Sequence, residues 1–125
     1  MSYLADTHAI IWFFQGAPAL SVGVNAILSD LSSPVAVSAV SIYEVDYKIA
    51  RGHLEKLPLQ FSSLLLGAGF SVLSLNLRHA ELAASLDLAH RDPWDRMIAA
   101  QAIAEGLTVL TRDPAIHALG ASVRW

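Results

Sequence analysis

Acidic side chains with the chemistry of a metal site occur at widely separated points of the chain. The candidates for such a site are Asp6, Glu44, Asp95 and Asp113. Four carboxylates held close together would repel one another, and their pKa values would rise unless a cation lay among them. Oxygen ligands, in a chain without cysteine or paired histidine spacing, favour Mg²⁺ or Mn²⁺ over zinc. Such a centre suits phosphodiester hydrolysis, because the metal can activate water and neutralise charge on the leaving oxygen.

The elements that would position these carboxylates alternate along the chain. The sequence predicts strands at residues 2–6, 35–38, 70–75, 107–111 and 122–125. Between them it predicts helices at residues 8–14, 21–31, 41–50, 58–69, 78–88, from Pro93 onward, and around Ile116. Strands separated by helices of this length pair in parallel through right-handed crossovers. The predicted fold is therefore a single α/β domain over residues 1–125, a three-layer sandwich with a mainly parallel central sheet.

This fold predicts that the acidic residues converge. Asp6 ends the first strand, and Asp113 lies just beyond Thr111 at the end of a later one. Glu44 lies one turn into a helix that leaves the second strand, and Asp95 lies in the first turn of the helix that starts near Pro93. Ligands of such sheets bind beyond the carboxyl ends of the strands, so we expect all four carboxylates at that edge.

Each acidic residue also has an ordinary structural explanation. Asp92 precedes a proline, as does Asp113, and both fit the N-cap of a helix. Glu44 precedes Lys48 by four residues, the spacing of a weak surface ion pair. Asp6 could simply close a turn. Taken separately these explanations are strong, but together they require four unrelated features to meet at one sheet edge.

Composition limits the class of protein. The 125 residues are 54% hydrophobic and only 15% charged, against about 25% charged in typical globular chains. This predicts that a second copy or another protein covers part of the surface. The absence of cysteine fits a reducing cytoplasm. The uncharged stretches at residues 9–29 and 57–77 are interrupted by proline, glycine, asparagine and glutamine, so no membrane span is predicted.

The net charge of −3 first argues against a nucleic-acid partner. If four of the eleven acidic residues bind metal, however, eight basic side chains remain against seven acidic ones, a balance of +1. Net charge therefore does not exclude RNA.

Three segments carry a family resemblance: "LADTHAIIWFF", "SAVSIYEVDYKIARGHL" and "HRDPWDRMIAAQAIAEGLTVLTRDPAI". In order and spacing the chain resembles VapC-type PIN-domain toxins. The resemblance implies a Rossmann-like fold and a metal-dependent endoribonuclease, the toxin of a type II toxin–antitoxin pair, held inactive by a VapB-like antitoxin and commonly dimeric. It also implies the acidic site of the family at Asp6, Glu44, Asp95 and Asp113, with support from Thr7, Thr111 and Asp92. Asp46 and Trp94 depart from the usual family residues, but neither belongs to the acidic set.

Basic and aromatic side chains receive separate predictions. Possible contacts to RNA phosphates are Lys48, Arg51, Arg96 and Arg112. The five histidines share no motif, and most are interpreted as surface or turn residues. Trp12, Phe13 and Phe14 are interpreted as core or dimer contacts rather than a platform for stacking bases.

Two other classes of protein are compatible with this architecture. A phosphoacceptor receiver domain would carry an acidic doublet after the first strand and a lysine after the last, whereas here Asp6 stands alone and no lysine follows Lys56. A catalytically silent PIN-like module that acts only through its protein partner stays open. The prediction is a cytoplasmic Mg²⁺- or Mn²⁺-dependent ribonuclease.

Overall fold

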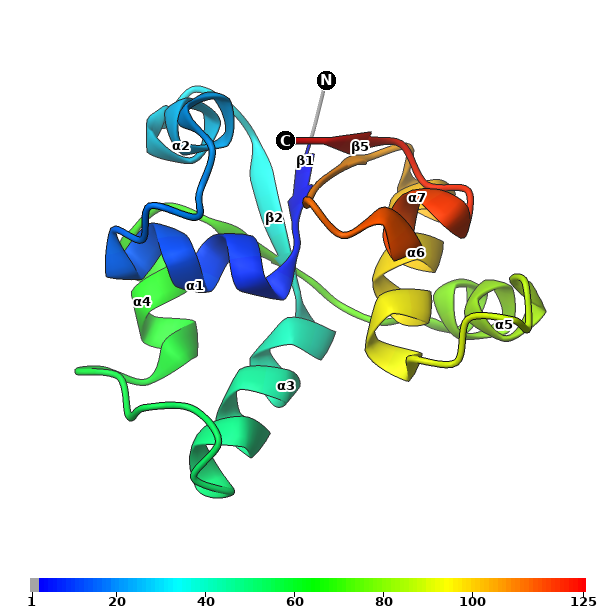
Figure 1. Cartoon of the computed structure of the whole chain (residues 1–125), viewed down its shortest axis with the longest axis horizontal. Coiled ribbons are helices and arrows are strands. Elements are labelled where there is room, and N and C mark those ends of the chain that lie inside the picture. Colours follow the sequence, from blue (N-terminus) through cyan, green and yellow to red (C-terminus); the bar gives the residue numbers. More distant parts are fainter. Residues whose placement is uncertain (1–2) are drawn as a thin grey trace.

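A five-stranded parallel sheet forms the centre of the computed structural model, which describes residues 3–125 (Figure 1). The strands are β1 Tyr3–Ala5, β2 Val35–Ser38, β3 Ser71–Leu73, β4 Thr108–Leu110 and β5 Val123–Arg124. Their order in the sheet is β3-β2-β1-β4-β5. The central strand β1 pairs on both sides, since Ala5 lies opposite Val37 of β2 and Leu110 of β4.

Helices cover both faces of this sheet. They are α1 Thr7–Gln15, α2 Val22–Ser29, α3 Ala39–Ala50, α4 Phe61–Gly67, α5 Leu77–Ser85, α6 Pro93–Glu105 and α7 Pro114–Ala118. In Figure 1 the helices α1 to α4 lie on one side of the strands and α5 to α7 on the other. The prediction of a three-layer α/β sandwich is therefore confirmed.

Alternation along the strands divides the core in two. Successive strand residues point to opposite faces of a sheet, so neighbouring positions belong to different clusters. Ala5 and Leu110 pack in the cluster formed with helices α1 to α4, which includes Ile10. Leu4 and Val109 pack in the other cluster, against α6 and α7.

Several helices start at a side-chain cap that the sequence supplies. Ser21 accepts a hydrogen bond from the backbone N–H of Val24, and Ser38 accepts one from that of Val40. Because Ser38 caps α3, this helix begins two residues before the predicted start at residue 41. The predicted helix at residues 58–69 begins only at Phe61.

The strand β2 has its predicted bounds, whereas the other strands are shorter than predicted. The segment 70–75 forms a strand only at Ser71–Leu73, an edge strand that pairs with β2 alone. The first strand was predicted from Ser2, which lies outside the described residues. Over residues 3–125, none of the helices has the length and apolar composition needed to cross a membrane.

The strand order creates one reversal point. From β1 the chain leads first to β2 on one side, and later to β4 on the other. The carboxyl ends of β1 and β4 therefore flank the crevice where open α/β sheets bind their ligands. Asp6 directly follows β1, and Thr111 directly follows β4.

Candidate active site

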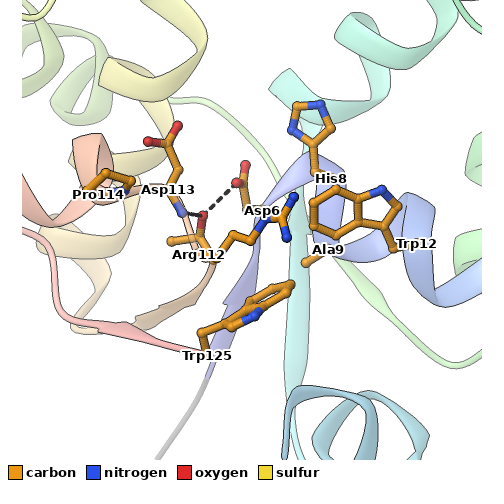
Figure 2. Close-up of a pocket in the computed structure, with 9 residues that line it drawn as sticks. Asp6, His8, Ala9, Trp12, Arg112, Asp113, Pro114 and Trp125 are labelled. Atoms are coloured by element: carbon orange, nitrogen blue, oxygen red, sulfur yellow. Dashed lines mark hydrogen bonds between the residues drawn. The ribbon is translucent and has the colours of Figure 1, made fainter. Parts of the chain in front are cut away.

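A hydrogen bond joins the ends of the two strands at this crevice. Thr111 Oγ1 donates to Asp6 Oδ2 at 2.8 Å, between residues 105 positions apart in the chain. The same hydroxyl oxygen accepts from the backbone N–H of Asp113 at 3.0 Å. Thr111 thus sets the position of the Asp6 carboxylate and of the loop that carries Asp113, as drawn by the dashed lines in Figure 2.

Asp6 is buried and fixed at both carboxylate oxygens. Its Oδ1 atom accepts from the backbone N–H of Thr7 at 2.8 Å, where Asp6 also caps α1. Burial raises the pKa of Asp6 above its ordinary value of 3.8, and the hydrogen bonds from Thr111 and Thr7 and the nearby His8 oppose this increase. The neighbouring Glu44 raises the pKa further. The protein therefore holds a carboxylate where its charged form is costly.

Asp95 occupies the start of α6, beyond the cap of that helix. The Asp92 side chain accepts from the N–H of Trp94 at 2.9 Å, so its predicted capping role is confirmed. Asp95 Oδ2 lies 3.0 Å from His90 Nε2. Partial burial raises the pKa of Asp95, the His90 contact lowers it, and the charges of Asp92, Asp113 and Asp6 raise it again.

Glu44 faces the same region from α3. Its Oε1 accepts from Thr7 Oγ1 at 2.9 Å, and its Oε2 lies 2.5 Å from Lys48 Nζ. The predicted ion pair with Lys48 is therefore present, but on a glutamate that is only 6% exposed rather than on the surface. Thr7 Oγ1 also lies 2.8 Å from the hydroxyl of Ser41, a buried side chain that carried no sequence signal.

The four carboxylates interact electrostatically. The charge of Glu44 raises the pKa of Asp6, and the charges of Asp6 and Asp113 raise the pKa of Asp95. Within residues 3–125, no lysine or arginine forms an ion pair with Asp6, Asp95 or Asp113. Asp113 is an N-cap as well, since it accepts from the N–H of Ala115 at 2.9 Å. Each residue thus has a local structural role and a place in a common negative field.

The donor set matches a divalent cation in its chemistry. Uncompensated carboxylate oxygens suit Mg²⁺ or Mn²⁺ chemically. As the side chains stand, however, no three His, Asp or Glu side chains in the described part of the chain are close enough together to hold a metal ion. The charges fit a cation that is held directly by one or two carboxylates and keeps several waters, as is usual for Mg²⁺.

The basic residues differ in their availability for RNA. The guanidinium of Arg96 donates to backbone carbonyls around the end of α5, those of Ala83, Ala84, Leu86, Asp87 and His90. These contacts satisfy carbonyls that a helix end leaves without partners, so the predicted phosphate role does not fit Arg96. Arg51 is exposed and donates to Tyr47 Oη at 3.0 Å. Arg112 is also exposed, and its guanidinium lies 4.5 Å from the centre of the Trp12 ring.

A cavity of about 380 Å³ opens beside Asp6. Its lining, drawn in Figure 2, consists of Asp6, His8, Ala9, Trp12, Thr111, Arg112, Asp113, Pro114 and Trp125. Trp12 was predicted to be a core or dimer residue but borders this cavity, whereas Phe13 and Phe14 pack against Phe70. Trp125 was missed, because no local pattern indicates that the end of β5 returns to the first helix.

The interpretation of most histidines as surface or turn residues holds, since His8, His53 and His117 are exposed and His90 lies in the loop before α6. His79 is the exception. His79 is fully buried, where its N–H and ring complete a capping box with Asn76 and its Nε2 lies 2.8 Å from Glu105 Oε1. His90 contacts Asp95 directly. The available signal for the position of His79 was Asn76, a residue that commonly caps helices and lies three residues before it.

Comparison with known proteins identifies the family of this fold. The family model of the PIN domain matches residues 3–121. No curated protein matches the chain significantly in sequence. Among solved structures, FitAcB from Neisseria gonorrhoeae is similar over 97% of this chain and 95% of that chain, with 25% identity and a TM-score of 0.71.

Two further structures share the fold at lower identity. VapBC2 from Rickettsia felis, bound to a DNA fragment from its promoter, is 15% identical with a TM-score of 0.74, over 99% of this chain and 98% of that chain. A toxin–antitoxin complex from Klebsiella pneumoniae is 23% identical with a TM-score of 0.70, over 99% and 97%. The family match covers nearly all of the described residues, and the resemblance seen in the sequence is confirmed: the chain belongs to the PIN domain family.

Proposed function

We propose that this protein is the toxin of a toxin–antitoxin pair and acts as a divalent-metal-dependent endoribonuclease. One observation carries the proposal. Asp6, Asp95 and Asp113 share a negative field at the crevice between β1 and β4, without a lysine or arginine partner among residues 3–125. The helix caps do not require these charges to lie close together, and their mutual repulsion destabilises the fold, so a bound cation is the simplest explanation.

The residues that would hold the cation are Asp6, Asp95, Asp113 and Glu44, with Mg²⁺ or Mn²⁺ as the ions of matching chemistry. When bound, such an ion polarises the phosphoryl oxygen, lowers the pKa of an attacking water and balances charge on the leaving oxygen. Hydrolysis by the usual route of this family would leave a 5′-phosphate and a 3′-hydroxyl.

The surrounding side chains support the acidic residues in distinct ways. Thr111 and the N–H of Thr7 restrict both oxygens of Asp6, so its carboxylate needs little reorganisation. His90 orients Asp95. Lys48 balances Glu44, which leaves the remaining carboxylates as the uncompensated charge. The exposed Arg112 and Arg51 are available for backbone phosphates of RNA.

The proposed partners are an antitoxin of the VapB kind and a second copy of the chain. The surface supports this part of the proposal, because large apolar side chains are exposed on both helix layers, including Leu66 of α4 at 63% and Leu77 of α5 at 76%. Apolar area of this kind commonly marks protein contacts. The structures named above are complexes of toxin with antitoxin, which is the arrangement proposed for this chain.

Cleavage assays on the purified full chain, free of antitoxin, test the proposal. We expect single-stranded RNA to be cut with Mg²⁺ or Mn²⁺ and to stay intact with EDTA. Asp6→Asn and Asp95→Asn should reduce cleavage to background. Asp46→Asn is the matched control, because Asp46 is an exposed aspartate of α3 outside the acidic cluster, and its activity should equal that of the wild type.

Two results would contradict the proposal. Cleavage that persists in EDTA would exclude the metal mechanism. A folded wild-type protein that binds its antitoxin but leaves RNA intact with either metal would instead support a catalytically silent binding module.

A further inference from the structure

We infer that the cavity beside Asp6 is a binding site for one unpaired nucleobase of the RNA, with Trp125, Trp12 and Arg112 as the residues that contact the base. The inference rests on the proposed function, which it deepens by assigning a specificity site to the reaction. It depends on the way in which polar and aromatic residues are distributed around the cavity (Figure 2).

The cavity has two chemically different ends. Asp6, Thr111 and Asp113 form a polar end that belongs to the acidic site itself. Trp12 and Trp125 form an aromatic end. A nucleotide has the same division, because a charged phosphate is joined to a flat, largely apolar base. A phosphate at the acidic end would place its neighbouring base beside the tryptophans.

The aromatic end offers the groups that bind single-stranded RNA. Trp12 and Trp125 meet edge to face with ring centres 5.9 Å apart, and the His8 ring lies 5.7 Å from that of Trp12. Trp125 is 36% exposed, so its ring surface is accessible to a ligand. Unpaired bases stack on aromatic rings and on the planar guanidinium of arginine.

Arg112 lines the cavity together with the residues of its polar and aromatic ends. Its guanidinium lies 4.5 Å from the Trp12 ring centre, and Arg112 lines the same cavity as Asp6, yet it makes no ion pair with any carboxylate of residues 3–125. An arginine in this position can contact a base or the adjoining phosphate. The cavity volume of about 380 Å³ lies within the range of small-ligand sites, roughly 300–1,000 Å³.

Tryptophan fluorescence provides a direct test that does not need catalysis. Trp94 lies in α6 outside the cavity, so the experiments use a Trp94→Phe background and selective excitation of tryptophan, which leaves Trp12 and Trp125 as the observed tryptophans. The probes are a short oligoribonucleotide of mixed sequence and an oligomer with the same ribose–phosphate backbone but no bases, both in EDTA. Because both oligomers carry the same phosphates, repulsion by the acidic residues affects both.

We expect the oligoribonucleotide to quench the fluorescence and to bind at least several-fold more tightly than the abasic oligomer. Trp125→Ala should weaken binding of the oligoribonucleotide by about tenfold and leave the abasic oligomer unaffected. Trp125→Phe keeps a ring and should retain most of the affinity. Leu59→Ala, which removes an exposed apolar side chain from the loop before α4 and outside the cavity lining, is the control and should bind as the parent protein does.

Mapping of cut positions in RNA separates this inference from the proposed function. With metal, Trp125→Ala should still cut but with an altered preference for the base next to the cleaved bond. If wild-type protein cuts RNA and Trp125→Ala changes neither binding nor cut positions, the base site is wrong and the nuclease stands. If base-dependent binding through Trp125 is found without any metal-dependent cleavage, the nuclease is wrong and the base site stands. Loss of antitoxin affinity with unchanged RNA binding would overturn the inference in favour of a protein ligand.

Discussion

Thr111 Oγ1 donates a 2.8 Å hydrogen bond to Asp6 Oδ2 and accepts the N–H of Asp113, so one hydroxyl joins the carboxyl ends of β1 and β4. Both residues of the Thr111–Asp6 hydrogen bond are buried, since Thr111 is 3% exposed and Asp6 is 7% exposed. A buried hydroxyl bonded on both sides is costly to remove, because each partner is left unsatisfied.

Thr111→Val therefore tests whether Asp6 must be held in place. Valine preserves the shape of threonine but provides no hydrogen bond. We expect RNA cleavage to fall by about 10- to 100-fold, the usual effect of losing an orienting contact at a metal ligand. The free energy of unfolding should fall by about 1–3 kcal/mol. Thr111→Ser restores the hydroxyl and should recover most of the activity, and a Val variant with full activity would contradict a positioning role.

Asp6 should contribute to function at the expense of stability. Burial raises its pKa in the folded protein above the ordinary 3.8, so the folded state binds more protons than the unfolded state between these two values. The contribution of Asp6 to stability is then most favourable below pH 3.8 and is lost as the pH rises through the folded pKa. The fully charged, metal-free protein at neutral pH bears the entire cost.

Asp6→Asn removes this charge and leaves the Thr111 hydroxyl able to accept from the new amide. In EDTA at pH 7.5 we expect the variant to be more stable than the wild type and to have the higher Tm, because the buried charge is removed. The difference should shrink as the pH is lowered towards 3.8, and a lower Tm for the variant throughout this range would contradict the assignment of a strained charge.

Divalent metal should reverse that order of stability. A ligand that binds only the folded state stabilises it by about 2.7 kcal/mol at a concentration 100-fold above Kd. Thermal unfolding of the wild type should shift upward with increasing Mn²⁺ or Mg²⁺, whereas Asp6→Asn and Asp95→Asn should respond much less. Equal shifts in all three proteins would place the metal elsewhere.

Sequence predicted most of the fold because the pattern of strands and helices is consistent with one architecture. Asp92, Ser21 and the prolines of α6 and α7 mark helix starts through local chemistry. The boundaries of β3 and α4 were less accurate, since pairing at a sheet edge and packing decide where such short elements stop.

The acidic residues could be predicted to face one edge of the sheet because parallel strands have their carboxyl ends at the same edge. Their detailed partners could not. The ion pair between Lys48 and Glu44 could be predicted from helical spacing. The burial of Glu44 against Thr7 could not, because it depends on how α3 packs on α1. Trp125 reaches the cavity through the position of β5 beside β4, which no local signal specifies.

Arg96 and Arg112 are both arginines, but their replacement should have opposite effects on stability and on RNA binding. Arg96 donates to backbone carbonyls at the end of α5, so Arg96→Ala leaves several of them unsatisfied and should lower the free energy of unfolding by about 2–3 kcal/mol. Arg112 is exposed and makes a single cation–π contact, so Arg112→Ala should change stability by less than about 1 kcal/mol.

For RNA binding we expect the reverse, with a larger effect of Arg112→Ala than of Arg96→Ala. A phosphate contact contributes through release of counterions, so Arg112→Ala should weaken RNA binding and reduce the slope of log K against log salt by about one. Arg96→Ala, measured at a temperature where it is fully folded, should keep the wild-type slope, because its guanidinium is occupied by the chain itself. Urea unfolding and salt titrations of RNA binding give both quantities for each variant. A reduced slope for Arg96→Ala alone would mean that this arginine leaves α5 to contact phosphate when RNA binds.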